Sequence, residues 1–307
     1  MQKLNASVSF LSDYVKNIKP AQSEKVNHFS DFSTEALEYL RGDGSVSGDP
    51  MPWMKTQSFI RFRPAEVTIW AGTNGSGKSL VSTQVAVSLS TYTRVAIASF
   101  EMPPHTTTAR IYKQCGGGDI SDEYAERINQ KLDLFIYNHI GTVTTQDVYN
   151  LCQYMAVEMG VKHIFIDCLI KIKMDISSYS KEADAIRDFM STIQNIAKQY
   201  KIHIHVVHHT RKSEKETDTP DKYSVRGASD LVDLTDNLLL VWRNLKKEND
   251  IAFGEKVDDE IEPDCYIKTA KQRHAVGQEK QVFFFWFNQE TTQWCERSDR
   301  RRHIYVH

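Results

Sequence analysis

Before the end of its first third, the chain reads Gly72-Thr73-Asn74-Gly75-Ser76-Gly77-Lys78-Ser79. This is a complete G-x-x-x-x-G-K-[ST] phosphate-binding pattern. Its glycines let backbone N–H groups converge on phosphate oxygens, Lys78 neutralises charge on the β- and γ-phosphates, and Ser79 ligates Mg²⁺. An apolar run over 66–71 precedes the loop and an amphipathic helical pattern over 80–89 follows it, so a helix dipole is expected to face the phosphates. The sequence therefore predicts binding of ATP or another NTP with Mg²⁺, the alternative being an ordinary Gly-rich turn.

Around this loop, β-type runs alternate with helical patterns. Strands are expected over 66–71, 94–100, 132–138, 163–167, 202–208 and 237–242, and helices over 145–159 and 182–199. Alternation of this kind predicts an α/β fold with a mainly parallel sheet and helices on both of its faces. The runs 265–271 and 280–287, on either side of Gly277, predict a C-terminal antiparallel hairpin.

The first fifty residues have a different character, because they are polar and contain two short helical patterns and a turn-rich stretch. One face of the second pattern carries Phe32, Ala36, Leu37 and Leu40. Gly42 is a plausible stop for this helix, which is marginal by itself unless it packs on something. We therefore divide the chain into a short helical N-terminal extension, 1–50, and one α/β domain, 51–307.

Composition excludes several classes of protein. Lys+Arg 38 against Asp+Glu 40 gives a net charge of −2, which argues against a globally basic nucleic-acid-binding surface and leaves a local one open. The chain has no apolar run of about 18 residues and no signal-peptide pattern, so no membrane association and a cytoplasmic location are expected. The 5 cysteines lack C-x-x-C spacing and are expected to be free core thiols.

Two acidic residues stand where predicted strands end. Asp167 closes the apolar run 163–167 and is interpreted as the carboxylate that serves Mg²⁺, the alternative being an Asp that caps a turn. Glu101 directly follows the run 94–100. The carboxyl ends of parallel strands share one edge with the phosphate loop, so Glu101 is expected to reach a water that faces the γ-phosphate. The alternative for Glu101 is a solvated glutamate at a helix start.

The chain resembles DnaB-type replicative helicases, and most closely the helicase halves of phage and mitochondrial primase-helicases. Six segments occur in that family's order: the phosphate loop, 99–102, 166–167, 206–211, 225–228 and 271–273. The likeness spans about 61–288 and implies a RecA-like P-loop NTPase core. It also implies a phage- or plasmid-type homo-oligomer, a hexameric ring that translocates on single-stranded DNA with a separate primase or loader. Only about sixty residues precede the core, so we expect no priming chemistry and a linker helix over 32–40 that packs on the next subunit.

The same resemblance implies roles for single residues. Glu101 matches the catalytic glutamate, Asp167 the Walker B acid, and His209 the residue that links the γ-phosphate to a DNA-binding loop. Lys271 and Arg273 match a basic pair that reaches the neighbouring subunit's nucleotide, with Arg273 as the arginine finger; the alternative is a solvated strand face. The residues expected to contact DNA are Arg211, Lys212, Arg226 and Arg243. Arg243 also matches a family arginine near the base.

Other functions remain open at this point. Histidines at 203, 205, 208 and 209 suggest zinc, but side chains alternate along a strand and the cluster lacks carboxylate or Cys partners, so a structural role is favoured. The aromatic run 283–287 suggests base stacking, although core packing is the more common use. One rival function is a RecA-like ATPase of recombinase or clock type, and another is a non-hydrolysing loader or scaffold. Glu101 argues against the scaffold, and the order of Lys271 and Arg273 favours the helicase.

Overall fold

The computed structural model describes residues 27–41, 48–174, 182–210, 225, 228–274 and 279–307. The chain divides into two compact units, Met1–Ser47 and Gly48–His307. In the first unit, the 3₁₀ helix η1 (Phe29–Phe32) leads into α3 (Ser33–Arg41). His28 and Asp31 form a capping box at the start of η1, and the apolar side chains of Phe32, Leu37 and Leu40 are exposed. The linker role of this helix stays a prediction, and Gly42 lies outside the described residues.

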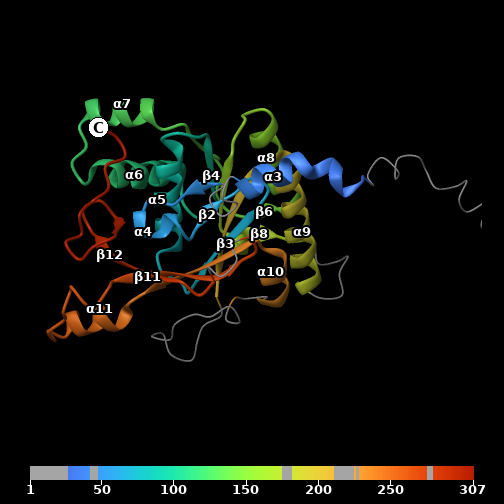
Figure 1. Ribbon diagram of the computed structural model, residues 1–307. Helices are drawn as coiled ribbons and strands as arrows, with labels where there is room; N and C mark the ends of the chain where they lie inside the picture. Colours follow the sequence, from blue (N-terminus) through green and yellow to red (C-terminus); the bar gives the residue numbers. More distant parts are fainter. Residues whose placement is uncertain (1–26, 42–47, 175–181, 211–224, 226–227, 275–278) are drawn as a thin grey trace, which may run out of the picture. The chain divides into compact units, whose positions relative to one another are not determined.

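The second unit is built on a nine-stranded sheet with the order β13-β12-β11-β10-β3-β9-β7-β4-β5 (Figure 1). Its strands are β3 (Val67–Gly72), β4 (Val95–Ser99), β5 (Leu134–Ile136), β7 (His163–Asp167), β9 (His203–His209), β10 (Asn237–Arg243), β11 (Cys265–Gln272), β12 (Val282–Asn288) and β13 (Gln293–Cys295). The strands from β10 to β5 are parallel to one another, and β11, β12 and β13 pair in antiparallel fashion. The mainly parallel sheet and the C-terminal hairpin are therefore confirmed, with Gly277 outside the described residues.

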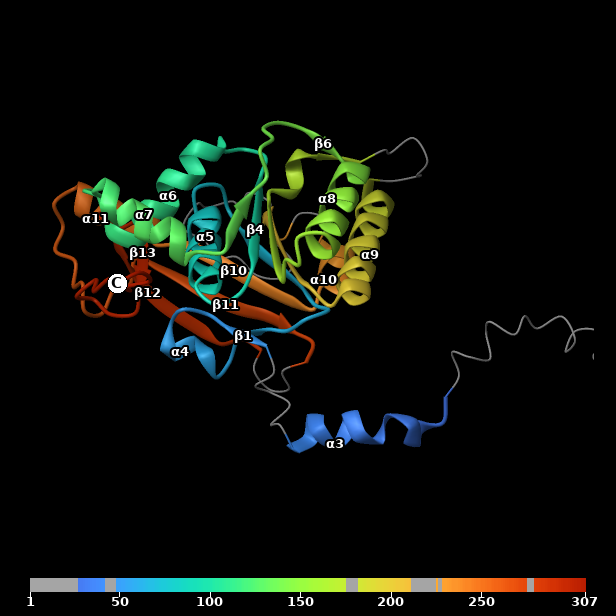
Figure 2. The same ribbon diagram turned by 90° about the horizontal axis from the view of Figure 1, so that it is seen from above.

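Helices cover both faces of this sheet, as the alternation predicted (Figure 2). The helices described in this unit are α4 (Met54–Gln57), α5 (Lys78–Ser90), α6 (Pro104–Gly116), α7 (Asp122–Lys131), α8 (Thr145–Val157), η2 (Leu169–Lys171), α9 (Glu182–Tyr200), α10 (Ala228–Leu234) and α11 (Leu245–Ala252). Two small strand pairs complete the unit. The strands β1 (Asp49–Pro50) and β2 (Arg61–Phe62) are antiparallel, and β6 (Val143–Thr144) and β8 (Ile172–Lys173) are parallel.

The core forms two layers because successive strand residues point to opposite faces. Ile69 belongs to the cluster that packs under α8 and α9, whereas its neighbour Trp70 belongs to the cluster under α5. Within the aromatic run 283–287, Phe283 and Phe285 are buried and Phe284 is exposed, so core packing accounts for the buried pair. Every cysteine is free and buried, as expected. Among the described residues, no helix is long and apolar enough to cross a membrane.

The helix after the phosphate loop corrects one prediction. The pattern over 80–89 indicated an amphipathic helix, but α5 is buried on nearly all sides. One side of it faces the sheet, and β13 covers another, where Gln84 Nε2 donates to the Trp294 carbonyl at 3.1 Å and Trp294 N donates to Gln84 Oε1 at 2.7 Å. Residues of the C-terminal segment therefore enclose a helix whose polar positions looked solvent-facing in sequence.

Candidate nucleotide site

The phosphate loop joins the carboxyl end of β3 to the amino end of α5, as its sequence predicted. Gly75 and Gly77 have φ values of +75° and +88°, in the left-handed region that favours glycine. A Cβ on Gly72 would lie 2.3 Å from the Val241 carbonyl oxygen, and one on Gly77 would lie 3.1 Å from the Trp294 ring. The three glycines are thus required by backbone conformation or by close packing, which leaves the loop's N–H groups at the start of a helix.

Lys78 lies inside this loop and is almost fully buried. Its Nζ donates to the carbonyl oxygens of Gly72 at 3.0 Å and Thr73 at 2.7 Å. Burial lowers the pKa of Lys78 to about 8, and the carboxylates of Asp167 and Glu101 act in the opposite direction. A triphosphate would supply the negative charge that favours the ammonium, so the site suits an anionic ligand.

Ser79 and Asp167 meet beside the loop. Asp167 pairs with Ser99 at the carboxyl ends of β7 and β4, and its side chain is buried. Burial raises the pKa of Asp167, while a hydrogen bond from the Ser79 hydroxyl lowers it. Asp167 Oδ1 is buried without a hydrogen-bond partner among the described residues. A free carboxylate oxygen next to a hydroxyl is a donor set that fits Mg²⁺, which prefers oxygen ligands.

Glu101 and His209 face the same cleft of about 900 Å³, together with the phosphate loop and Lys171. Glu101 follows β4 and is exposed, whereas His209 ends β9 opposite Gly72 and is half-buried. Burial and then Lys78 lower the pKa of His209, which favours the neutral imidazole. The structure therefore brings together Lys78, Ser79, Asp167, Glu101 and His209, all of which the sequence singled out.

Three further residues lie in or beside the cleft, and none of them was expected at the nucleotide site. Arg110, from α6, shares the cleft, and burial lowers its pKa while Asp167 raises it. Lys171, from η2, lines the same space, so Lys78 is not the only cation near the phosphate site. Cys168 follows Asp167 and is fully buried; burial raises the pKa of its thiol to about 12, and the thiol contacts the Glu101 carboxylate. The positions of Arg110 and Lys171 depend on tertiary packing, and no local pattern in the sequence signals them, whereas Cys168 lies at the site because it follows Asp167.

Arg243 lies at the other side of the phosphate loop. It forms an ion pair with Glu248 and donates to the Gly75 carbonyl at 3.5 Å. Arg243 and Gly75 line a cavity of about 670 Å³, and Phe287 and Trp294 also line it. The contact of Arg243 with the nucleotide near the base and its alternative contact with DNA both stay predictions.

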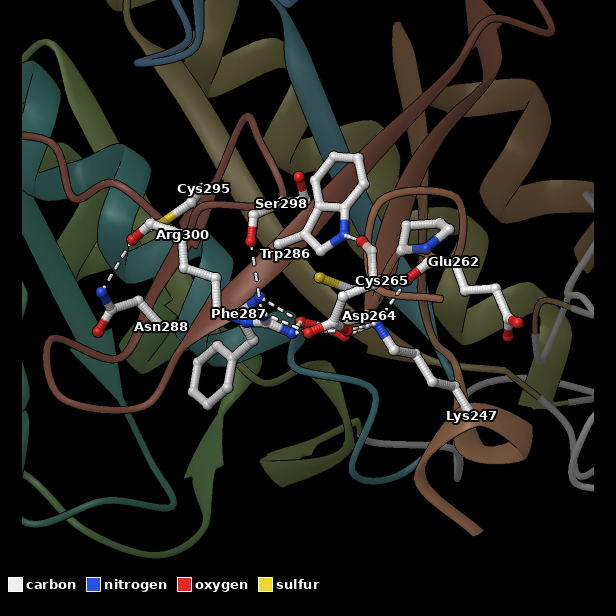
Figure 3. A network of polar contacts seen from close by, with 12 residues as sticks. Lys247, Glu262, Asp264, Cys265, Trp286, Phe287, Asn288, Cys295, Ser298 and Arg300 are labelled. Atoms are coloured by element: carbon white, nitrogen blue, oxygen red, sulfur yellow. Dashed lines mark hydrogen bonds and ion pairs between the residues drawn. The ribbon is translucent and has the colours of Figure 1, made fainter. Parts of the chain in front are cut away.

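A network of ion pairs forms one wall of that cavity (Figure 3). Lys247 Nζ lies 2.6 Å from Asp264 Oδ1, and Arg300 Nη2 lies 3.2 Å from Asp264 Oδ2. Arg300 comes from the C-terminal segment and Lys247 from α11, so Asp264 fastens these two elements together beside the loop.

Lys271 and Arg273 lie at the opposite edge of the sheet. Lys271 pairs with Leu238 near the start of β10, and Arg273 N donates to the Asp236 carbonyl just before it. Lys271 is level with Ile69 of β3, about 10 Å along the strand from Gly72, and Arg273 is level with the start of β3, about 17 Å from Gly72. Lys271 Nζ donates to the Val232 carbonyl at 2.6 Å, and Arg273 binds Asp236 and the Asp233 carbonyl. In its own chain the pair therefore holds the C-terminal end of α10.

Arg211, Lys212 and Arg226, with the loop 211–224, lie outside the described residues. His203 bonds to Thr68 Oγ1 at 2.8 Å and to the Arg63 carbonyl at 2.6 Å, which supports a structural role. The expectation that the cluster lacks a carboxylate was wrong, because His163 joins it, contacts His205 at 3.3 Å, and lies 2.9 Å from Asp49.

The parallel sheet with a phosphate loop after β3, and the antiparallel strands beyond β10, define a RecA-like P-loop domain of the kind found in helicase ATPase domains. Residues 61–215, half of the chain, match the model of the family described as AAA domain. The chain belongs to this AAA domain family, which implies nucleotide binding.

Two solved structures support the fold. One, described as an ATPase domain, superposes with a TM-score of 0.73 at 13% identity, and the match covers 88% of this chain and 99% of that one. A DnaB-like replicative helicase, studied with its interactions with primase, gives a TM-score of 0.70 at 14% identity, covering 95% of this chain and 76% of that one. The resemblance to DnaB-type helicases is thereby confirmed at the level of the fold.

Proposed function

We propose that this protein is a Mg²⁺-dependent ATPase that drives a replicative-type DNA helicase. The observation that carries the proposal is the convergence of Lys78, Ser79, Glu101 and His209 on one cleft at the carboxyl ends of the parallel strands, with Asp167 hydrogen-bonded to Ser79 beside it. Phosphoryl transfer from a loop-bound nucleotide requires a cation, a metal-holding carboxylate and a group that orients water, and this cleft supplies each.

The chain's own residues divide this chemistry. When the nucleotide binds, Lys78 Nζ leaves the loop carbonyl oxygens and binds the β- and γ-phosphates. The backbone N–H groups around Gly75 and Gly77 bind oxygens of the same phosphates. Ser79 and Asp167 would hold Mg²⁺, which would neutralise charge on the phosphates when bound. Glu101 accepts a proton from the attacking water, and its exposed position lets the carboxylate reach that water. His209, at the end of β9, contacts the γ-phosphate. It thereby couples the presence of this phosphate to the segment that begins at residue 211.

We further propose that the protein works as a hexameric ring of phage or plasmid type, in the cytoplasm of the host cell. Support comes from Arg273 and Lys271, which lie too far from their own phosphate loop to contact its nucleotide and so suit a neighbouring subunit's site. A ring would enclose single-stranded DNA, contacted by Arg211, Lys212 and Arg226. The likeness to a helicase studied with primase makes a separate primase or loader a natural partner.

Unwinding of a forked DNA duplex tests the proposal, with negative-stain imaging of the protein in ATP. We expect strand separation that requires Mg²⁺-ATP, ATP hydrolysis stimulated by single-stranded DNA, and ring-shaped particles. Lys78→Ala should reduce hydrolysis and unwinding to background, because the charge on the β- and γ-phosphates is removed. Hydrolysis in Lys78→Ala at the wild-type rate would contradict the nucleotide assignment. ATP hydrolysis with filaments or double rings and no unwinding would instead establish the RecA-like ATPase of recombinase or clock type.

A further inference from the structure

A second group of side chains with metal-ligating atoms lies beside the nucleotide cleft, apart from the Ser79–Asp167 pair. Glu101, Cys168 and His209 each offer one ligand atom, and these atoms all lie within 4.8 Å of one another. The three residues come from the ends of β4, β7 and β9, which are neighbours in the sheet. Sheet register, rather than a flexible surface, therefore holds the three groups together.

The donor types identify the class of cation. A thiolate, an imidazole and a carboxylate form a ligand set typical of zinc and similar thiophilic divalent cations, whereas Mg²⁺ takes oxygen ligands almost exclusively. Tetrahedral zinc, with bonds of about 2.0–2.3 Å, needs ligand atoms about 3.5 Å apart. The group must contract by roughly 1 Å to meet this geometry. Glu101 is exposed and can move, while Cys168 is fixed in the core.

The surroundings of the group support such a site. The Cys168 thiol already contacts the Glu101 carboxylate, and the carboxylate of Asp167 also acts on it. His209 Nδ1 is buried without a hydrogen-bond partner among the residues that the structure describes. A divalent cation would bind the thiolate and the carboxylate, release the thiol proton to solvent, and leave a fourth position for water.

We propose that Glu101, Cys168 and His209 form an inhibitory site for zinc(II) or a similar thiophilic cation. Glu101 bound to the cation can no longer accept a proton from the attacking water, so hydrolysis stops. The Ser79–Asp167 pair and Lys78 are not ligands of this cation, so nucleotide binding persists. The inhibitory part of the proposal rests on the proposed ATPase function.

Metal binding is measured on the full chain without nucleotide and with Mg²⁺ in excess. Zn²⁺ is titrated against a chromophoric chelator, and Co²⁺ serves as a spectroscopic probe. We expect one Zn²⁺ per chain and a sulfur-to-cobalt charge-transfer band. Cys168→Ser should abolish the band and weaken Zn²⁺ binding by at least 10–100-fold, since even residues that only support a ligand have effects of about that size.

Cys295→Ser is the matched control, because this buried cysteine donates to the Arg300 carbonyl and a serine hydroxyl can do the same. It should leave Zn²⁺ affinity and the band unchanged. Circular dichroism establishes that Cys168→Ser is folded; if it is not, His209→Ala decides the question, with the same expected loss. Equal Zn²⁺ affinity in the wild type and the folded ligand variant, or no charge-transfer band in the wild type, would overturn the site.

Inhibition is measured by phosphate release at saturating Mg²⁺-ATP. Micromolar Zn²⁺ should inhibit the wild type, a chelator should restore it, and fluorescent ATP analogue binding should persist. Zn²⁺ bound at the site with undiminished hydrolysis would overturn the inhibitory role. The binding titration needs no hydrolysis, so it decides the metal site independently, whereas a wild type that hydrolyses no ATP overturns the proposed function.

Discussion

The two ends of the parallel strands, here called the carboxyl edge and the amino edge of the sheet, differ in what surrounds their buried polar groups. At the carboxyl edge, Asp167 Oδ1, His209 Nδ1 and Thr210 Oγ1 lack hydrogen-bond partners among the described residues. At the amino edge, Glu66 Oε1 and Gln272 Oε1 also lack hydrogen-bond partners among the described residues, but they lie among paired groups: Asn237 Nδ2 donates to Glu66 Oε2 at 2.9 Å, and Arg273 lies 3.0 Å from Asp236.

This difference distinguishes unsatisfied groups beside a cleft, where a ligand can bind them, from groups whose pairing stabilises the fold. An unsatisfied buried polar group costs about 1–3 kcal/mol, and a ligand bound in the cleft that His209 and Thr210 line would offset this cost at the carboxyl edge. Pairs at the amino edge instead set the register of β3, β9 and β10. His209 and Thr210, which carry unsatisfied atoms and also line the cleft, lie at the carboxyl edge, in agreement with the position of the phosphate-loop motif.

Arg273 gives the most severe test of this division, because it lies at the amino edge and is nonetheless proposed to act in catalysis. Arg273→Ala should lower ATP hydrolysis by about 10³-fold or more, since a guanidinium supplied by a neighbouring subunit can contribute that much. ATP binding and assembly should persist. Arg301→Ala, at an exposed arginine, is the control and should hydrolyse ATP normally.

Mixing Arg273→Ala with Lys78→Ala protein separates a catalytic role from a structural one. A mixed interface can pair an intact loop with an intact finger, so verified mixed assemblies should recover part of the hydrolysis. If verified mixtures are no more active than the separate variants, or if Arg273→Ala keeps full activity, Arg273 belongs only to the structural edge.

Glu101 provides the corresponding test at the carboxyl edge. Glu101→Gln should keep ATP affinity while turnover falls by on the order of 10²-fold or more, because a positioned base contributes roughly that. Steady-state phosphate release and nucleotide binding measure the two effects. Glu158→Gln, at an exposed glutamate on the far end of α8, is the control. Normal turnover in Glu101→Gln would place the base elsewhere.

The histidines near the amino edge give the smallest effect, and it concerns stability. Complete burial holds the pKa of His205 well below its usual 6.5. Such a group contributes stability above pH 6.5, and the contribution is lost as the pH falls below 6.5, because the unfolded chain binds the proton more readily. The unfolding free energy of the wild type should therefore fall more steeply below pH 6.5 than that of His205→Gln, by at most about 1.4 kcal/mol per pH unit.

Urea unfolding between pH 7.5 and 5.5 checks this difference in slope. The glutamine can still accept the hydrogen bond that Trp70 Nε1 donates to His205 at 3.3 Å, so the variant is a mild one. His105→Gln, at an exposed histidine, should match the wild type. Parallel stability curves for the wild type and His205→Gln would show that the buried histidine does not carry the pH dependence.

Sequence reasoning recovered what local patterns encode. The strands β3, β4, β7, β9 and β10 were predicted within a residue or two, because a strand buried on both faces reads as an apolar run. Lys78, Asp167 and Glu101 were found because each stands at a strand end or in a motif. Arg110 was missed, since its place beside Asp167 depends on how α6 packs. The burial of α5 was missed for the same reason, because β13 comes from far along the chain.

The contact between Trp294 and Gly77 changes what counts as the smallest functional piece of this chain. Gln84 bonds to Trp294 and to Tyr305, and the Tyr124 hydroxyl donates to the Val306 carbonyl, so the final residues are anchored to the helices around the phosphate loop. A fragment that ends after the hairpin would keep every recognisable motif. It would lose Trp294, which packs against Gly77 of the phosphate loop. Expression boundaries for this domain should therefore extend through Val306, well past the last residue that any nucleotide-binding pattern would select.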